Sequence, residues 1–285
     1  MLDGMTHTIA SPAVVSGNAV GRLVRRRPLV SFFVLSCAFA WWPGALYVNG
    51  WSPTVQAGFG PFLAAVVVIA LTEGRSGVRG LLARMVRWRV PKRAYAAALA
   101  TPLLLSGAAI GINLAIGAAR PAGADLALWT QIPVTLLLVL LVPGLGGAWE
   151  EPGFRGYALP RLEARFGVVT GPLVLGGLWV LWHLPLFLTG DILWPDVIVV
   201  VAASVVIASV FHLGRESVLI AMIFHATNNA VGGNYASLLF HGADKTRLNL
   251  ITAAGWSILA VVVAIRAARK AAVIRGAVVA DPTVG

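Results

Sequence analysis

Six polar side chains interrupt otherwise apolar stretches of this sequence, and their types are those that hydrolysis requires. They comprise two adjacent carboxylates, one arginine, two histidines and one asparagine: Glu150, Glu151, Arg155, His183, His225 and Asn229. A carboxylate or an imidazole that is held away from water can act as a general base or a general acid. Together these residues indicate a site that transfers protons during hydrolysis.

The spacing of these residues decides which of them can act together. Glu151 and Arg155 are four residues apart, so on a helix they share a face and can form an ion pair. Glu150 points about 100° away from that face, which leaves it without a partner of its own. His225 and Asn229 are also four residues apart, so both can face one cavity.

Each residue also has a simpler structural interpretation. A glutamate pair at a helix end is often only a boundary charge, and a lone histidine in an apolar helix often packs through a hydrogen bond, as we expect of His212. His183 differs, because Trp179 and Phe187 lie four residues on either side of it and predict aromatic surroundings for its ring. The combination of these residues within three segments, rather than any one of them, favours chemistry.

The elements that must position these side chains are membrane-spanning helices. Apolar residues make up 58% of the 285 residues and charged residues only 12%, against roughly 45–50% and about 25% in ordinary soluble domains. Runs of about 20 uncharged residues are long enough to cross the hydrocarbon layer as helices. Ionisable groups inside such spans are costly and persist where they pair or do chemistry. The sequence therefore predicts an all-α polytopic membrane protein with its helices around an intramembrane cavity.

We expect eight spans in one transmembrane domain over residues 28–267, with the motif-bearing core at 131–240. The predicted spans are 28–48, 56–72, 94–118, 131–150, 170–189, 196–213, 217–239 and 249–266. A flexible cytoplasmic tail is expected at 1–27 and a basic cytoplasmic tail at 268–285. A signal peptide is the alternative at the start, since residues 38–40 match A-x-A, but the apolar run continues too far for one.

The basic residues fall mostly on one side of these spans. Of 22 lysines and arginines, 19 lie on that side, and only Arg120, Lys245 and Arg247 lie on the other. The positive-inside rule then places both termini in the cytoplasm. The net charge of +11 is explained by topology, so we expect a lipid bilayer and no nucleic acid as partner. The basic loop at 77–93 is predicted to be either an amphipathic helix on anionic lipid or an orientation signal only.

Arginine outnumbers lysine 19 to 3, which indicates a bacterial source and hence an inner (plasma) membrane.

Prolines and glycines predict irregular backbone beside the glutamates. Pro152 cannot donate to residue 148, so the helix should kink or restart there. The approach to it contains further residues that loosen a helix, namely Pro143, Gly144, Gly146 and Gly147. A broken helix inside a membrane usually lines a protein cavity or water.

Three short motifs make this chain resemble the CPBP family, which contains CAAX prenyl endopeptidases and bacteriocin-processing or immunity proteins and is also called the abortive-infection family. The first motif is two glutamates followed, after three more residues, by an arginine, and it is matched by Glu150, Glu151 and Arg155. The second is an aromatic residue with a histidine four positions later, matched by Trp179 and His183. The third is a histidine with an asparagine or similar residue four positions later, matched by His225 and Asn229. The family commonly has phenylalanine in place of Trp179, and the resemblance covers residues 131–240.

The resemblance implies an intramembrane endopeptidase. It implies that Glu150 and His183 activate a water molecule, while His225 and Asn229 stabilise the oxyanion of the tetrahedral intermediate. The neighbouring ion pair then has a supporting role.

Metal use is a separate question, because members of the family are often named metalloproteases. Glu150, His183 and His225 would make a His₂Glu zinc set with water as the fourth ligand. No H-E-x-x-H helix supports such a site. The same residues can work without a metal as a glutamate-activated water site, and we favour that interpretation.

Two other functions are alternatives. A non-catalytic immunity or scaffold protein would keep the family motifs without cutting a substrate. A proton-coupled transporter would use glutamate and histidine as proton relays, but transporters often contain inverted repeats and no repeat is apparent in this sequence. For a protease, the expected partner is a membrane-associated protein or peptide substrate.

Overall fold

The computed structural model describes residues 19–280, with side chains from residue 21 to residue 273. Every regular element in that part of the chain is helical, as the composition predicts. The α-helices are α1 (Ala19–Arg26), α2 (Pro28–Tyr47), α3 (Gly60–Thr72), α4 (Gly74–Met85), α5 (Lys92–Ala115), α6 (Gly123–Ala127), α7 (Ile132–Leu141), α8 (Glu151–Gly153), α9 (Leu159–Trp182), α10 (Leu184–Thr189), α11 (Trp194–Leu213), α12 (Val218–Asn228) and α13 (Gly242–Ala280). Short 3-10 turns occupy Leu128–Gln131, Gly147–Glu150 and Ala236–Leu238, and π-helical turns occupy Phe154–Ala158 and Asn229–Gly233.

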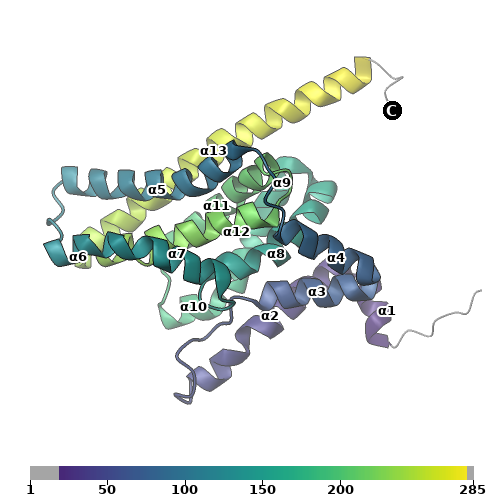
Figure 1. The fold of residues 1–285 in the computed structure, drawn as a ribbon, viewed down its shortest axis with the longest axis horizontal. Coiled ribbons are helices and arrows are strands. Elements are labelled where there is room, and N and C mark those ends of the chain that lie inside the picture. Colours follow the sequence, from purple (N-terminus) through teal and green to yellow (C-terminus); the bar gives the residue numbers. More distant parts are fainter. Residues whose placement is uncertain (1–18, 281–285) are drawn as a thin grey trace, which may run out of the picture.

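α12 lies in the middle of the bundle, in contact with α5, α7, α8 and α11 (Figure 1). Eight of its eleven residues are buried, which explains why this segment is apolar on nearly all faces. Outside it, α11 packs against α9 and α13, and α2 packs against α3. The bundle therefore holds the helix that carries His225 at its centre.

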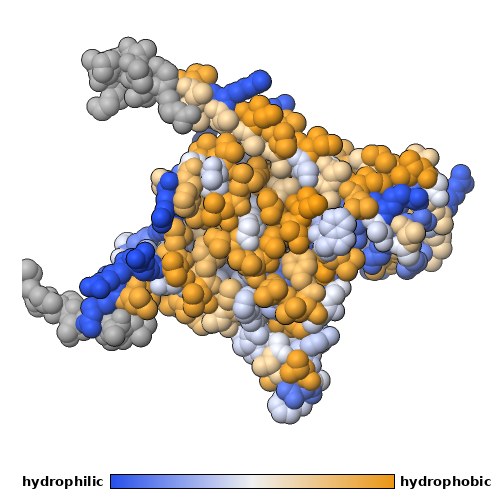
Figure 2. Space-filling model, turned by 180° about the vertical axis from the view of Figure 1, so that it is seen from behind, coloured by the Kyte–Doolittle hydropathy of each residue, from blue (hydrophilic) through white to orange (hydrophobic). Residues whose placement is uncertain are grey.

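The surface of the bundle is that of a membrane protein. Figure 2 shows a broad hydrophobic band across one face, with hydrophilic residues gathered at its two ends. Six helical segments of the described chain are long and apolar enough to cross a membrane, by length and composition: Pro28–Tyr47, Lys92–Ala115, Gly123–Leu141, Gly147–Trp182, Trp194–Leu213 and Gly242–Val273. The spans expected at 56–72 and 217–239 contain the shorter helices α3 and α12. The all-α polytopic class is confirmed, and the number eight stays a prediction.

The span predicted at 131–150 is wrong in its second half. α7 ends at Leu141, and the chain turns through residues 142–146 before helix resumes. Gly144 and Gly146 have φ angles of 93° and 149° in this turn, values that residues with a Cβ rarely adopt. The glycines beside the glutamates thus form a defined turn rather than a loosened helix.

This turn moves the glutamates from the end of one helix to the start of the next. Glu150 closes a 3-10 turn and Glu151 begins α8. Pro152 follows in the first helical turn, where its missing N–H has no helical partner to lose. Pro152 therefore begins the helix and does not kink it, and the irregularity comes later, in the π-helical turn Phe154–Ala158.

The span predicted at 170–189 is also broken. α9 kinks at Gly167, where φ is 86°, and ends at Trp182, so His183 lies between α9 and α10 instead of inside a helix. Pro185 explains the break, since it has no N–H to donate to the carbonyl of Leu181 and its ring would clash with that carbonyl in a continuous helix. His183 is consequently placed at a helix junction.

The ends of the chain are described only in part. Of the tail expected at 1–27, residues 1–18 lie outside the described residues, and Ala19–Arg26 form α1. Of the tail expected at 268–285, residues up to Ala280 continue α13, and 281–285 lie outside the described residues. The cytoplasmic location of both ends stays a prediction.

Candidate active site

Close contacts at glycine residues fix the position of α8, the short helix that begins at Glu151. A Cβ atom on Gly153 would lie 2.4 Å from the carbonyl oxygen of Pro61, and one on Gly60 would lie 2.8 Å from Ala40. Small residues of this kind let helix backbones approach closely in a membrane. α8 is therefore held against α3, and α3 against α2, at distances that only glycine permits.

Glu150 is held by an indole. The Nε1–H of Trp179 donates to Oε2 of Glu150 at 2.7 Å, and both side chains are buried. Oε1 of Glu150 has no hydrogen-bond partner among the described residues. One oxygen of this carboxylate is thus fixed, and the other is available for a water molecule or a substrate.

Glu151 is the centre of a second, buried set. Its Oε1 accepts hydrogen bonds from Nη1 of Arg155 at 3.0 Å and from Nδ1 of His225 at 2.7 Å. The side chains of Glu151 and Arg155 are 0% exposed. Because a carboxylate oxygen only accepts, Nδ1 of His225 carries a proton. The predicted ion pair is present, and it also orients a histidine 74 residues away in the chain.

Trp179 joins the three motifs. Its ring centroid lies 4.4 Å from the guanidinium carbon of Arg155, 5.4 Å from the ring of His225 and 5.6 Å from the ring of His183. With its hydrogen bond to Glu150, one indole contacts a residue of every motif. The cation–π contact with a buried guanidinium adds to the stability of this arrangement.

His183 is fixed by the junction in which it lies. Its Nδ1 is 2.9 Å from the carbonyl oxygen of Trp179, and since a carbonyl only accepts, Nδ1 donates, which in the neutral imidazole leaves the lone pair on Nε2. The carbonyl of Trp182, freed at the end of α9, accepts from Nε1 of Trp41 at 2.9 Å and from Nε2 of Gln56 at 3.0 Å. Of the two aromatic neighbours expected for His183, Trp179 is in ring contact with it, whereas Phe187 makes no ring contact with it among the described residues and Trp182 supplies the second ring.

The glycine turn closes the site against α12. A Cβ atom on Gly147 would lie 2.0 Å from Nε2 of His225, and one on Gly146 would lie 3.0 Å from Nδ2 of Asn229. The side-chain amide of Asn229 makes no hydrogen bond among the described residues. Nε2 of His225 and Nδ2 of Asn229 therefore face the same two-residue stretch of backbone.

All six residues singled out in the sequence thus meet around Trp179 and the glycine turn. Glu150, Glu151, Arg155 and His225 are buried, whereas His183 and Asn229 are partly exposed and mark the open edge of the site. The cavity expected among these residues stays a prediction. His212 is not part of the site: its Nε2 is 2.9 Å from Oε1 of Glu163, so the expected hydrogen bond is present, although the side chain is exposed and not packed in the interior.

The residues expected to hold zinc do not form a compact donor set. Among residues 21–273, no three His, Cys, Asp or Glu side chains lie close enough to share a metal ion. Glu150, His183 and His225 therefore do not form a ready metal site as they lie, and the use of a metal stays a prediction.

Contacts that the sequence does not reveal stabilise the site from outside. Nη2 of Arg84 donates to the carbonyl oxygen of Gly156 at 2.6 Å, within the π-helical turn that follows the glutamates. Leu81 is fully buried against Gly156. The basic loop at 77–93 therefore includes part of a helix, α4, that packs on protein. A second π-helical turn begins at Asn229, and such turns frequently occur at functional sites.

Comparisons with known proteins agree with the motifs. Residues 129–231 match the family model of type II CAAX prenyl endopeptidase Rce1-like proteins. A curated relative, CAAX prenyl protease 2 of Methanococcus maripaludis, is 27% identical over 106 residues, which are 33% of this chain and 37% of that protein. The chain thus spans little more than a third of the curated relative that it matches. The two findings confirm the resemblance to the CPBP family over this part of the chain, and with the apolar helices they identify an integral membrane protein.

Proposed function

We propose that this protein is an intramembrane endopeptidase that hydrolyses a peptide bond of a membrane-associated protein or peptide. The proposal rests chiefly on one observation: residues from three separate motifs contact a single indole, that of Trp179. Each ionisable side chain inside a membrane costs free energy, so two carboxylates and two histidines at one place indicate a functional role. The match to a family of endopeptidases supports the same conclusion.

In the proposed reaction, Glu150 is the general base. Oε1 of Glu150 takes a proton from a water molecule, whose oxygen attacks the carbonyl carbon of the scissile bond. Nε2 of His183 accepts a hydrogen bond from the same water and orients it, since its Nδ1 is occupied by a carbonyl. The proton is then passed to the leaving amine as the carbon–nitrogen bond breaks.

The oxyanion is stabilised by His225 and Asn229. Nε2 of His225 and Nδ2 of Asn229 lie over the same glycine turn, so both can donate to an oxygen placed beside it. His225 donates from Nε2 only when both of its nitrogens carry protons, and Glu151 compensates that charge through its 2.7 Å contact with Nδ1. Loss of one donor at such a site costs about 2.7–4 kcal/mol of transition-state stabilisation.

The charges of the buried groups fit this scheme. Glu150, Glu151 and Arg155 together carry one net negative charge when all are ionised. An uncompensated charge is costly away from water, and one proton on either His225 or Glu150 would remove it. The proposed first step uses the distribution in which His225 carries that proton, so that Glu150 is an ionised base while His225 is a donor.

The proposal is tested by comparing membrane proteomes of cells that contain the wild-type protein, Glu150→Ala or Glu216→Ala. Glu216 is an exposed carboxylate outside the site and serves as the matched control. We expect a C-terminal or leader fragment that appears with the wild type and with Glu216→Ala and is absent with Glu150→Ala. If no fragment in any membrane depends on Glu150, the protein is not an endopeptidase, and a phenotype that survives Glu150→Ala would indicate a binding protein instead.

A further inference from the structure

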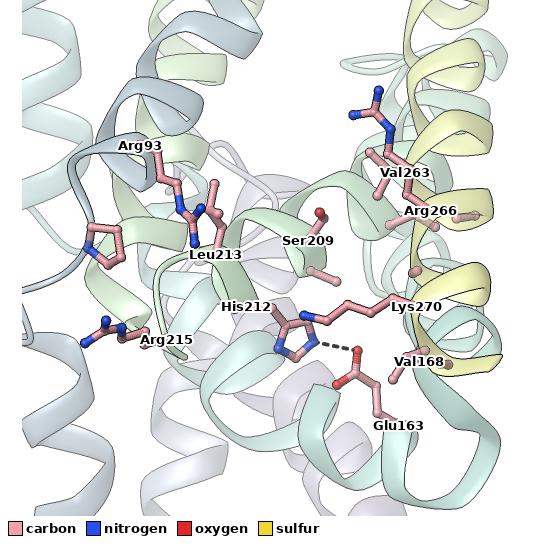
Figure 3. Close-up of a pocket in the computed structure, with 16 residues that line it drawn as sticks. Arg93, Glu163, Val168, Ser209, His212, Leu213, Arg215, Val263, Arg266 and Lys270 are labelled. Carbon is pink, nitrogen blue, oxygen red and sulfur yellow. Dashed lines mark hydrogen bonds and ion pairs between the residues drawn. The ribbon is translucent and has the colours of Figure 1, made fainter. Parts of the chain in front are cut away.

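A pocket of about 580 Å³ lies between α5, α9, α11 and α13, and neither Glu150 nor Glu151 lines it (Figure 3). Much of its wall is apolar, formed by aliphatic side chains such as Val168, Val205, Leu213 and Val263. Its polar lining is mostly basic and includes Arg93, Arg215, Arg266 and Lys270. The pocket thus combines an apolar wall with a cationic rim.

The four basic side chains have no acidic partner among the described residues. The ion pairs of arginine and lysine in that part of the chain involve other residues, Arg155, Arg161 and Arg247. The one carboxylate that lines the pocket belongs to Glu163, and its Oε1 is already bound by His212 at 2.9 Å. In Figure 3, the side chain of Lys270 extends from α13 toward this pair. The rim therefore carries an excess of positive charge.

The position of the pocket matches the headgroup region of a membrane. Arg93 is the second residue of α5, and the pocket is also lined by the last two residues of α11. Lys270 lies one turn beyond residue 266, where the last span is expected to end. Basic side chains at such a depth attract anionic headgroups, and basic pockets between transmembrane helices bind them. The apolar wall continues from this rim toward the membrane interior along α11 and α13.

We propose that this pocket binds one anionic diacyl phospholipid, with the headgroup phosphate among the basic side chains and an acyl chain against α11 and α13. A free phosphate ion would use the cations alone and would leave the apolar wall exposed. A neutral lipid would use the wall alone and would leave the cations without counter-charge. The site is separate from the proposed active site and does not depend on the proposed function.

The test measures lipid binding to the purified full-length protein in neutral detergent by native mass spectrometry. The probes are phosphatidylglycerol, phosphatidylcholine with the same acyl chains, and inorganic phosphate as a competitor. The test variant combines Arg266→Gln with Lys270→Gln, and Arg269→Gln is the matched control because it lies on the same helix but does not line the pocket. We expect about a fivefold weaker apparent affinity for phosphatidylglycerol per cation removed, hence about 25-fold for the double variant.

Lys270→Arg keeps the charge and should bind phosphatidylglycerol as the wild type does. Because Arg266 and Lys270 are exposed, the double variant should melt at the wild-type temperature when lipid is absent. Equal binding of phosphatidylcholine, or displacement of the lipid by inorganic phosphate at equal concentration, would overturn the proposal. So would an Arg269→Gln variant that loses as much affinity as the double variant.

Discussion

Gly147→Ala is the substitution that most sharply tests the geometry of the site. The added Cβ atom would lie 2.0 Å from Nε2 and 2.1 Å from Cε1 of His225, whereas ordinary contacts begin at 3.4 Å. The ring and the backbone must therefore separate by roughly 1.4 Å, the difference between 3.4 and 2.0 Å. His225 has little freedom to retreat, because Nδ1 is bound to Glu151 and the ring lies against Trp179.

Two effects of Gly147→Ala can be estimated. Overpacking a buried site costs about 1–3 kcal/mol of folding free energy. A displaced His225 no longer donates to the oxyanion, which should reduce turnover by about 10²–10³-fold. The variant is therefore expected to fold with a lower melting temperature and to lose nearly all activity.

The matched control is Gly177→Ala, which lies in α9 and would place its Cβ with no atom within 4 Å. Alanine should stabilise this helix slightly, by up to about 1 kcal/mol, and leave activity unchanged. The assay combines fragment yield in membranes with thermal unfolding of the purified proteins in detergent. If Gly147→Ala keeps activity within threefold of the wild type, then His225 does not occupy the functional position described here.

Three further substitutions separate stability from chemistry. Arg155→Ala removes the arginine partner of the buried Glu151, which keeps only its contact with His225, so we expect a loss of about 3–5 kcal/mol in unfolding free energy; an unchanged melting temperature would contradict the buried pair. Arg84→Gln removes the charged hydrogen bond to the π-helical turn and should cost about 1.5–3 kcal/mol in the same measurement, while Arg79→Gln on the same helix should cost nothing measurable. Asn229→Ala should lower turnover by about 10²-fold or more with no change in melting temperature, and equal activity losses in Asn229→Ala and Asn228→Ala would rule out a specific donor.

The sequence predicts the helical class, and which polar residues lie near one another, more reliably than the limits of the helices. Composition alone indicates helices in a membrane, and polar residues in apolar segments identify the residues that meet around Trp179. The pairing of Glu151 with Arg155 follows from helical spacing. These inferences succeed because each depends on residue type and on local periodicity.

Other features depend on contacts between distant segments, so the sequence alone does not show them. The orientation of His225 by Glu151 joins residues 74 positions apart. Pro152 begins a helix instead of kinking it because the preceding glycine turn ends the earlier helix first. The sequence does contain a signal for this turn, since Gly144, Gly146 and Gly147 precede the glutamates, but only the packing of α12 shows why glycine is required there.

The most direct test of the proposed mechanism is the turnover of one cleaved substrate by Glu150→Gln. Glutamine keeps the shape of the side chain and an oxygen that can accept from Nε1 of Trp179, but it cannot take a proton from water. General base catalysis accounts for about 10²–10⁴-fold in rate. The variant should therefore fold normally and cleave at least about 10²-fold more slowly, whereas cleavage at the wild-type rate would show that Glu150 is not the base.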